Sequence, residues 1–131
     1  MRNLSLILIF SLSLSVSSEE TISRWMADYF KRIHDHIGNE NYEKAQNELE
    51  MGDKNYFRGG RTYEAALLYQ LYGQFYAVQS QYTNAIPWFE KALATGKMPR
   101  IGQQEVRFQL AQTYFMIGNY ENVIPLLEEF I

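Results

Sequence analysis

Two histidines, His34 and His36, are the side chains of this sequence best suited to bind a metal ion. Zinc ligands on a single helix are four residues apart, because side chains two apart point in different directions. No third ligand lies beside this pair in the sequence. We therefore expect no metal and no cofactor, with His34 on an exposed inner face and His36 close to helix packing.

Acid–base chemistry would need paired carboxylates, and the chain has two such pairs, Glu48/Glu50 and Glu128/Glu129. A catalytic carboxylate needs burial or a close charged partner to shift its pKa. Both pairs are predicted on solvent-facing helix positions. The sequence has no cysteine and no GxSxG motif, and Gly59–Gly60 lacks the Lys-Ser/Thr of a phosphate-binding loop. We therefore expect that this protein is not an enzyme.

An aromatic series on one segment could stack on bases or sugars. It consists of Tyr63, Tyr69, Tyr72, Phe75 and Tyr76. Nucleic-acid binding also requires a basic surface, whereas the net charge is −3 and the isoelectric point is about 5.4. Nucleic acid is therefore excluded as a partner, as is an electrostatic anchor on anionic lipid. Tyrosines at helical spacing are more typical of a packed core.

The first eighteen residues, MRNLSLILIFSLSLSVSS, have the pattern of a secretory signal peptide. Arg2 precedes an apolar run of about 13 residues, which is too short to span a bilayer. Small residues, Val16 and Ser18, precede Glu19, so we expect cleavage between Ser18 and Glu19. Residues 1–18 would then be removed from a helical domain of residues 19–131. The product is expected in the periplasm of a Gram-negative cell, with no membrane insertion.

Apolar residues recur at i, i+3, i+4 and i+7 from Thr21 onward, which is the spacing of amphipathic helices. The predicted helices are a first that ends at Gly38, a second after Asn41, a third capped by Thr62, a fourth over about 82–94, a fifth over about 103–117, and a sixth after Gly118–Asn119. The segment 96–102 between the fourth and fifth is predicted to be a linker because it contains Gly and Pro. The fold class is therefore all-α.

The helices pair into repeats. The second helix of each pair begins with the same motif at a nearly constant interval, as Tyr42-x-x-Ala45, Tyr82-x-x-Ala85 and Tyr120-x-x-Val123. An interval of this length is typical of a solenoid, in which each unit buries its apolar face against the next. The middle unit resembles a tetratricopeptide repeat at Tyr69, Tyr72, Gly73, Tyr76, Ala85, Phe89 and Ala92. Small residues at Gly73 and Ala85 would allow two helices to approach closely, and Tyr76 and Phe89 would fill the space between units.

The resemblance extends over the chain after residue 18, as three units at about 21–60, 62–98 and 102–131. The third unit keeps Leu110, Ala111, Tyr114, Val123 and Leu127, and the first keeps Tyr29, Ala45 and Leu49. The first unit departs from the family pattern with Arg32 and His36. The expected architecture is an α-solenoid of antiparallel helix pairs, with six helices.

A narrower resemblance rests on the signal peptide and on the segments GGRTYEAALLYQLYGQFYA and YTNAIPWFEKAL. The chain is similar to secreted tetratricopeptide-repeat proteins that are encoded beside TonB-type energy-transducing systems. The family implies a concave face lined by the first helix of each pair. Its positions here are Phe30, His34, Gln70, Gln74, Phe108, Gln112 and Phe115. Amides and aromatic rings suit peptide capture, although these side chains could equally pack on a loop or on another chain.

The expected function is a periplasmic scaffold that binds a protein or peptide segment of a cell-envelope complex. Two alternatives stay open. One is a structural protein that self-associates through its open repeat ends, and the other is a non-catalytic binder of peptidoglycan or sugar.

Two prolines, Pro87 and Pro125, lie at equivalent positions of two repeats, inside segments with helical spacing. Proline in a helix interior costs roughly 3 kcal/mol. Both lie about 200° around the helix from Ala85 and Val123, at 3.6 residues per turn, so we expect them early in their helices and facing water. There they would bend the helix toward its usual curvature, and their recurrence would reflect duplication of the repeat.

The end of the sequence is apolar, with Val123, Ile124, Leu127, Phe130 and Ile131 and no helix stop signal. A repeat array needs a polar terminal cap. We therefore expect either that the natural chain continues beyond residue 131 or that it self-associates through this end.

Overall fold

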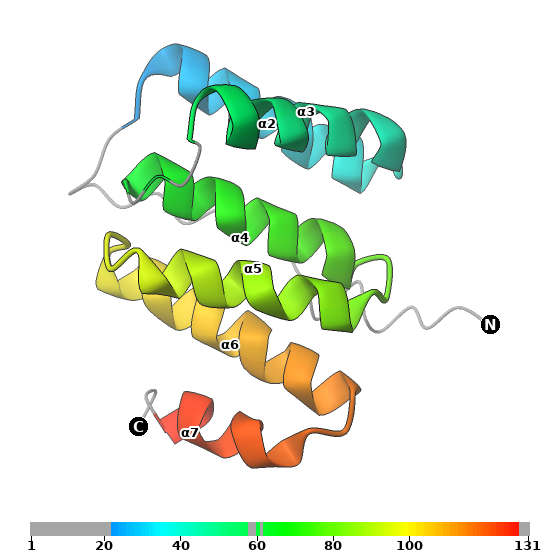
Figure 1. The fold of residues 1–131 in the computed structure, drawn as a ribbon, viewed down its shortest axis with the longest axis vertical. Coiled ribbons are helices and arrows are strands. Elements are labelled where there is room, and N and C mark those ends of the chain that lie inside the picture. The colour runs from blue at the N-terminus through cyan, green and yellow to red at the C-terminus, as the bar shows by residue number, and fades with distance from the viewer. Residues whose placement is uncertain (1–21, 58–59, 61, 129–131) are drawn as a thin grey trace.

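A computed structural model describes residues 22–57, 60 and 62–128 of the chain, and six α-helices lie within them (Figure 1). The helices are α2 (Arg24–Gly38), α3 (Tyr42–Asn55), α4 (Tyr63–Ala77), α5 (Tyr82–Ala94), α6 (Arg100–Met116) and α7 (Val123–Glu128), with a 3₁₀ turn, η1 (Tyr120–Asn122), before α7. The prediction of an all-α fold with six helices is confirmed.

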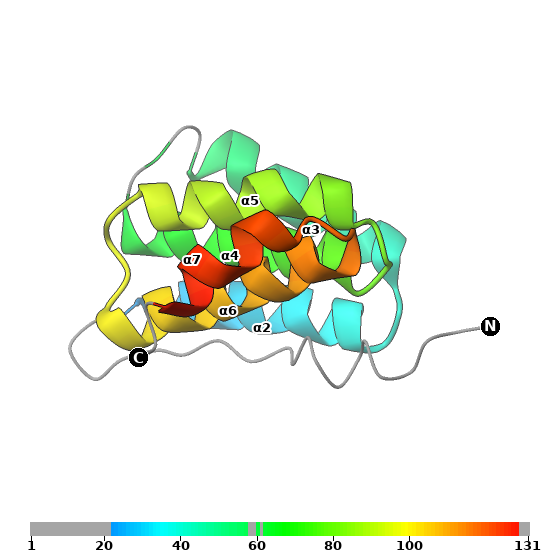
Figure 2. The same cartoon turned by 90° about the horizontal axis from the view of Figure 1, so that it is seen from below.

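The helices stack in the order of the chain. Each packs against the next, from α2 and α3 at one end to α7 at the other, and consecutive helices run in opposite directions (Figure 1). Viewed along the stack, α3 and α5 lie on one side, and α2 and α6 lie on the other (Figure 2). This consecutive pairing is consistent with a small helical repeat array.

Helix α4 forms the centre of the core. Every residue from Ala65 to Phe75 is buried, so this helix has neighbours on all sides. Among those neighbours, α5 approaches it most closely, because Gly73 faces the ring of Phe89. A side chain at position 73 would overlap that ring. The predicted close approach at Gly73 is therefore present.

The turns within the three helix pairs share one geometry. Glu40, Ser80 and Gly118 adopt positive φ angles of 61°, 63° and 80°. In each turn the next residue donates its backbone N–H to a carbonyl five residues earlier, as Asn41 does to His36 at 2.8 Å. This is the bond that closes a helix with a left-handed residue. The turns recur at the same interval as the sequence repeat, once in each unit.

Thr62 and Asn41, the two residues predicted to cap helix starts, differ in the bonds that their side chains make. The Thr62 Oγ1 accepts a hydrogen bond from the Ala65 N–H at 3.1 Å, which confirms Thr62 as the cap of α4. Asn41 does precede α3, but its side chain makes no capping bond. The N–H of Asn41 is used by the turn, and its backbone (φ −86°, ψ 67°) is not extended as at Ser23 and Thr62.

The linker predicted over 96–102 is shorter than expected. Helix α6 begins at Arg100 instead of Gln103, immediately after Pro99. Proline is compatible with a helix start, because the first N–H groups of a helix have no intrahelical partner. The Gln103 side chain secures this start by donating to the Met98 carbonyl at 2.7 Å.

Pro87 and Pro125 are both exposed, as the sequence predicts, but the helices that contain them differ in length and in how they begin. Pro87 lies within the continuous helix α5, whereas Pro125 lies in the first turn of the short helix α7, which follows the 3₁₀ turn η1. Proline lacks the N–H that would close the preceding turn. The turn before Pro125 has the tighter 3₁₀ form, whereas the turn before Pro87 is α-helical, so the missing N–H alone does not decide between the two forms.

These placements give a stability prediction for α5. Pro87→Ala is expected to be neutral or to raise the free energy of unfolding by up to about 1 kcal/mol, because Pro87 is exposed and alanine restores an N–H. Ala85→Leu is expected to lower it by about 1–3 kcal/mol, because Ala85 is fully buried. Urea midpoints of the two variants measure both effects. The reverse order would contradict the assignment of the helix faces.

No helix in the described part of the chain is both long and apolar enough to cross a membrane. The predicted signal peptide and its cleavage site lie outside the described residues.

Candidate functional site

Three of the seven predicted concave-face residues form an accessible strip on α6. Phe108, Gln112 and Phe115 follow the i, i+4, i+7 spacing that places side chains on one side of a helix. Phe108 is 46% exposed and Phe115 is 57% exposed. The Oε1 atom of Gln112, between them, is buried and has no hydrogen-bond partner among the described residues. We refer to Phe108, Gln112 and Phe115 as the α6 strip. It combines two half-exposed rings with one half-buried amide side chain.

Three other predicted residues are buried. Phe30 is 2% exposed, and Gln70 and Gln74 have no exposed surface. The amide of Gln70 donates to Oε1 of Glu105 at 3.1 Å and to Oε1 of Gln109 at 3.2 Å. This side chain therefore joins α4 to α6. In this structure Phe30, Gln70 and Gln74 are not open to a ligand, so the accessible part of the predicted face lies on α6.

Gln109 and Glu105, which hold Gln70, were not among the predicted residues. They follow Gln70 by 39 and 35 residues, close to one repeat length. This spacing places them on the corresponding helix of the next unit. A search for polar residues one repeat apart would have found them.

His34, the seventh predicted residue, is half-buried on α2. Burial lowers the pKa of its imidazole, with Lys31 adding to the effect and Asp35 opposing it. His36 is also half-buried. Within the described residues, no group of three or more His, Cys, Asp or Glu side chains could hold a metal ion.

The lowered pKa of His34 predicts a pH dependence of stability. The unfolded chain binds a proton at this residue more readily than the folded chain does. The contribution of neutral His34 to stability is therefore fully present above the pKa that this residue has in the unfolded chain, near 6.5. This contribution is lost as the pH falls below that value. The difference in unfolding free energy between wild type and His34→Gln should change between about pH 8 and pH 5.5, and urea titrations at each pH measure it. A constant difference would contradict the prediction.

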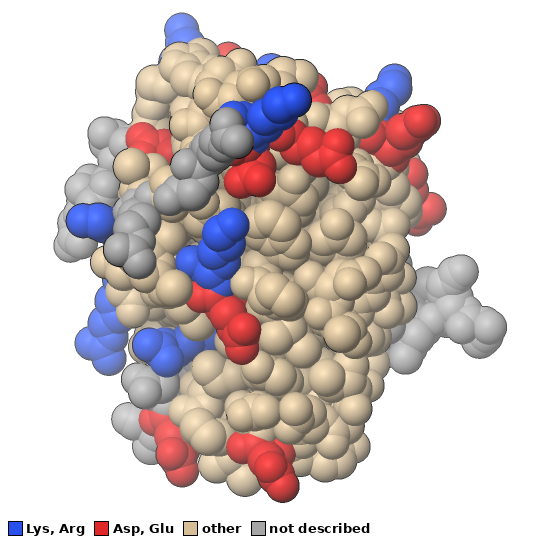
Figure 3. Space-filling view, viewed as in Figure 1, with Lys and Arg blue, Asp and Glu red and all other residues tan. Residues whose placement is uncertain are grey.

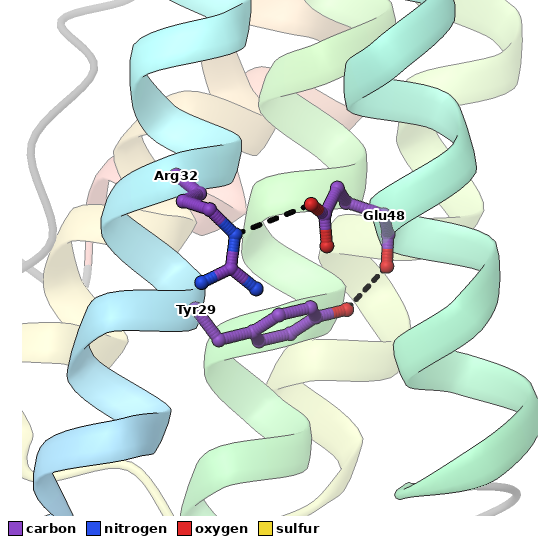
Figure 4. A network of polar contacts seen from close by, with 3 residues as sticks. All are labelled: Tyr29, Arg32 and Glu48. Carbon is purple, nitrogen blue, oxygen red and sulfur yellow. Dashed lines mark hydrogen bonds and ion pairs between the residues drawn. The ribbon is translucent and has the colours of Figure 1, made fainter.

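The carboxylate of Glu48 has a structural role. Its Oε2 lies 3.2 Å from Nε of Arg32, and its backbone carbonyl accepts a hydrogen bond from the Tyr29 hydroxyl (Figure 4). The Arg32 guanidinium lies over the Tyr29 ring, 5.7 Å from its centroid. Arg32, which departs from the repeat pattern, therefore joins α2 to α3. Glu50 and Glu128 are exposed, and Glu129 lies outside the described residues.

The aromatic series on α4 belongs to the core. Tyr63, Tyr69, Tyr72 and Phe75 are all buried, and Tyr76 is half-buried. Tyr72 stacks on Trp88 of α5, with ring centroids 3.8 Å apart. Its partner is thus a ring of the same protein. The interpretation as packing is favoured over a platform for bases or sugars.

Comparison of this chain with protein-family models, with curated proteins and with solved structures gives no significant match. The described part of the chain consists of six sequential helices packed pairwise.

Proposed function

We propose that this protein is a binding module of the tetratricopeptide-repeat type that captures an extended protein segment on the α6 strip. The sequence pattern of the middle unit, the helix pairing and the recurrent left-handed turns support this type of repeat. The predicted signal peptide of residues 1–18 supports a periplasmic site of action. The resemblance to secreted repeat proteins encoded beside TonB-type systems supports a partner in a cell-envelope complex of that type.

The observation that carries the proposal is the combination of groups on the α6 strip. Phe108 and Phe115 offer two half-exposed rings about two helical turns apart, and such rings bind apolar side chains of a peptide. The Oε1 atom of Gln112 is a buried acceptor that has no partner among the described residues. A buried polar group without a partner is costly, so the Gln112 amide gains a hydrogen bond if it turns to meet an N–H of a bound peptide.

The Tyr114 hydroxyl lies beside this strip on α6 but is already engaged. It donates to Oε2 of Glu90 at 2.7 Å, and burial together with this bond raises its pKa to about 12. The bond joins α6 to α5 and holds the helix that presents the strip.

Site-specific photo-crosslinking tests the proposal. A benzophenone amino acid is placed at Phe108 or Phe115 in cells that export the protein, and at Tyr56 as a control. Tyr56 is 50% exposed, but it lies at the other end of the stack. We expect one discrete envelope protein to be crosslinked from Phe108 and Phe115 and not from Tyr56. Adducts from all three positions, or from Tyr56 alone, would contradict the proposal.

A second step then identifies the segment. Synthetic peptides that tile the captured protein are titrated against the wild-type chain and against Phe115→Ser and Gln112→Leu. One peptide should bind, and each substitution should weaken it at least tenfold. If the chain instead sediments with purified peptidoglycan and binds no peptide, the sugar-binding alternative is favoured.

A further inference from the structure

A row of four charged residues follows the outer side of α2, which lies at one end of the stack (Figure 1). The row consists of Arg24, Asp28, Lys31 and Asp35, and all four residues are exposed. Their spacing of four, three and four residues keeps them within about 60° of one another around the helix. The buried residues of α2 lie on the opposite side of the helix. We refer to these four charged residues as the α2 row.

The order of the charges in the α2 row makes it complementary to its own antiparallel copy. Read from Arg24, the signs alternate from positive to negative, and the spacing is the same from either end. In an antiparallel pair, Arg24 of one copy lies opposite Asp35 of the other, and Asp28 lies opposite Lys31. A parallel copy would place like charges opposite one another, which is unfavourable.

Half of the α2 row is unpaired within the described part of the chain. Lys31 forms an ion pair with Asp35 at 2.8 Å, and the side chains of these two residues remain 74% and 52% exposed. Arg24 and Asp28 form no ion pair with another described residue. A second chain can therefore meet the charges of Arg24 and Asp28 without breaking an ion pair among the described residues.

An apolar side chain borders the α2 row. Trp25 is 52% exposed and lies roughly 90° around α2 from the row, at 3.6 residues per turn. It is on the side of α3, because Tyr56 beyond it contacts its ring, with ring centroids 5.2 Å apart. Ion pairs at a surface contribute only about 0–1 kcal/mol each. Partial burial of Trp25 would add the apolar contact that such pairs lack, and tryptophan is frequent among the residues that dominate binding.

The two ends of the molecule differ in charge. The end formed by α2 and α3 shows both positive and negative side chains, whereas the charged side chains visible at the α7 end are acidic (Figure 3). Residues 108–131 contain three glutamates and neither lysine nor arginine. Two acidic ends would repel each other, whereas an end of mixed sign can complement itself. The charge pattern therefore selects α2 for contact with a second copy.

We propose that two copies of this chain pair through their α2 helices, antiparallel, around a twofold axis that passes between Asp28 and Lys31. Both copies contribute the same surface, so every contact occurs twice, as in other isologous dimers. Each charge of the α2 row gains an opposite charge of the other copy, and the two Trp25 rings border the contact. Helix α6 lies toward the other end of the stack, so the dimer presents two α6 strips (Figure 1). Two strips in one assembly increase the apparent affinity for a partner that has two binding segments.

Charge reversal with complementation tests the pairing. Arg24→Asp with Lys31→Asp makes the row entirely acidic, and Asp28→Lys with Asp35→Lys makes it entirely basic. We expect sedimentation velocity of the full chain to show a monomer–dimer equilibrium that each double variant loses, because like charges then face each other. An equimolar mixture of the two double variants should dimerise again. Trp25→Ser should weaken the wild-type dimer about tenfold.

Matched measurements separate this pairing from other contacts. Glu43→Lys with Glu50→Lys makes the same change of net charge as the basic variant, at exposed positions of α3, and should leave the dimer unchanged. Salt at about 1 M, where the Debye length is about 3 Å, should weaken the wild-type dimer. A monomeric wild type at high micromolar concentration, or a mixture of the two double variants that stays monomeric, would overturn the proposal. Association that persists in both double variants would also overturn it and would place the contact on another surface.

Discussion

Replacing Gly73 with alanine is expected to lower the free energy of unfolding by about 1–3 kcal/mol, although alanine is the better helix former. A Cβ atom at this position would meet the ring of Phe89, nearest to Cε1 and within 2.7 Å of Cζ. Phe89 has no exposed surface, so its ring cannot move aside into solvent. Helices α4 and α5 would have to separate at the centre of the core.

The same contact predicts a strong coupling between the two positions. Phe89→Ala alone should cost about 3–5 kcal/mol, because it leaves a cavity between α4 and α5. In that background, Gly73→Ala should become neutral or stabilising, because the added methyl group enters the cavity and favours the helix. Urea unfolding of the two single variants and the double variant measures the coupling. Additive effects would contradict the contact.

The contact between Gly73 and Phe89 illustrates what the sequence could predict. The spacing of large and small residues in the middle unit placed Gly73 and Ala85 at the interface between two helices, and both are buried there. Phe89 was predicted to lie between units, but its ring lies against Gly73 of α4 within the same unit. Helix α5 was also predicted with its observed bounds, Tyr82–Ala94. Local pattern and packing agree in this unit, because α5 has neighbours on both sides.

The helix ends were less predictable, because Gly and Pro have more than one structural role. Pro99 was interpreted as part of a linker, yet it immediately precedes α6, and Gly102 lies inside that helix. At position 102 a Cβ atom would meet only Met98 and Pro99, at 3.4 Å or more. Glycine there reflects no close helix contact. The sequence alone does not distinguish it from a loop glycine.

The sequence predicted which helix positions belong to the candidate site, but it did not predict which of their side chains are accessible. The family offsets selected positions on α2, α4 and α6. The exposed rings are on α6, whereas Phe30 is buried on α2 and Gln70 is buried on α4, where it bonds to Glu105 and Gln109. Burial of a polar side chain depends on partners one repeat away, and a pattern within one helix does not contain that information.

Gly52→Ala is expected to be destabilising by about 2–3 kcal/mol, for a reason that no sequence pattern indicated. A Cβ atom at position 52 would overlap the hydroxyl of Tyr29 and lie 2.8 Å from its Cζ. Tyr29 is 2% exposed, and its hydroxyl donates to the carbonyl of Glu48. Burial raises the pKa of this hydroxyl further above its ordinary value, and the group is protonated and able to donate at neutral pH. The ring is therefore held in place, and α2 and α3 would have to move apart.

Tyr29→Phe should partly rescue Gly52→Ala, because it removes the atom that the new methyl group meets first. On its own, Tyr29→Phe loses one hydrogen bond, worth about 1 kcal/mol. The double variant should therefore be more stable than the sum of the two single effects predicts, by about 1–2 kcal/mol. Gly102→Ala is the matched control, since its Cβ atom would make ordinary contacts, and it should be neutral or stabilising by up to about 1 kcal/mol. Chemical denaturation of the four variants decides. If Gly52→Ala behaved like Gly102→Ala, the close approach of α3 to Tyr29 would be refuted, and with it the assignment of Gly52 as the residue that allows α2 and α3 to pack.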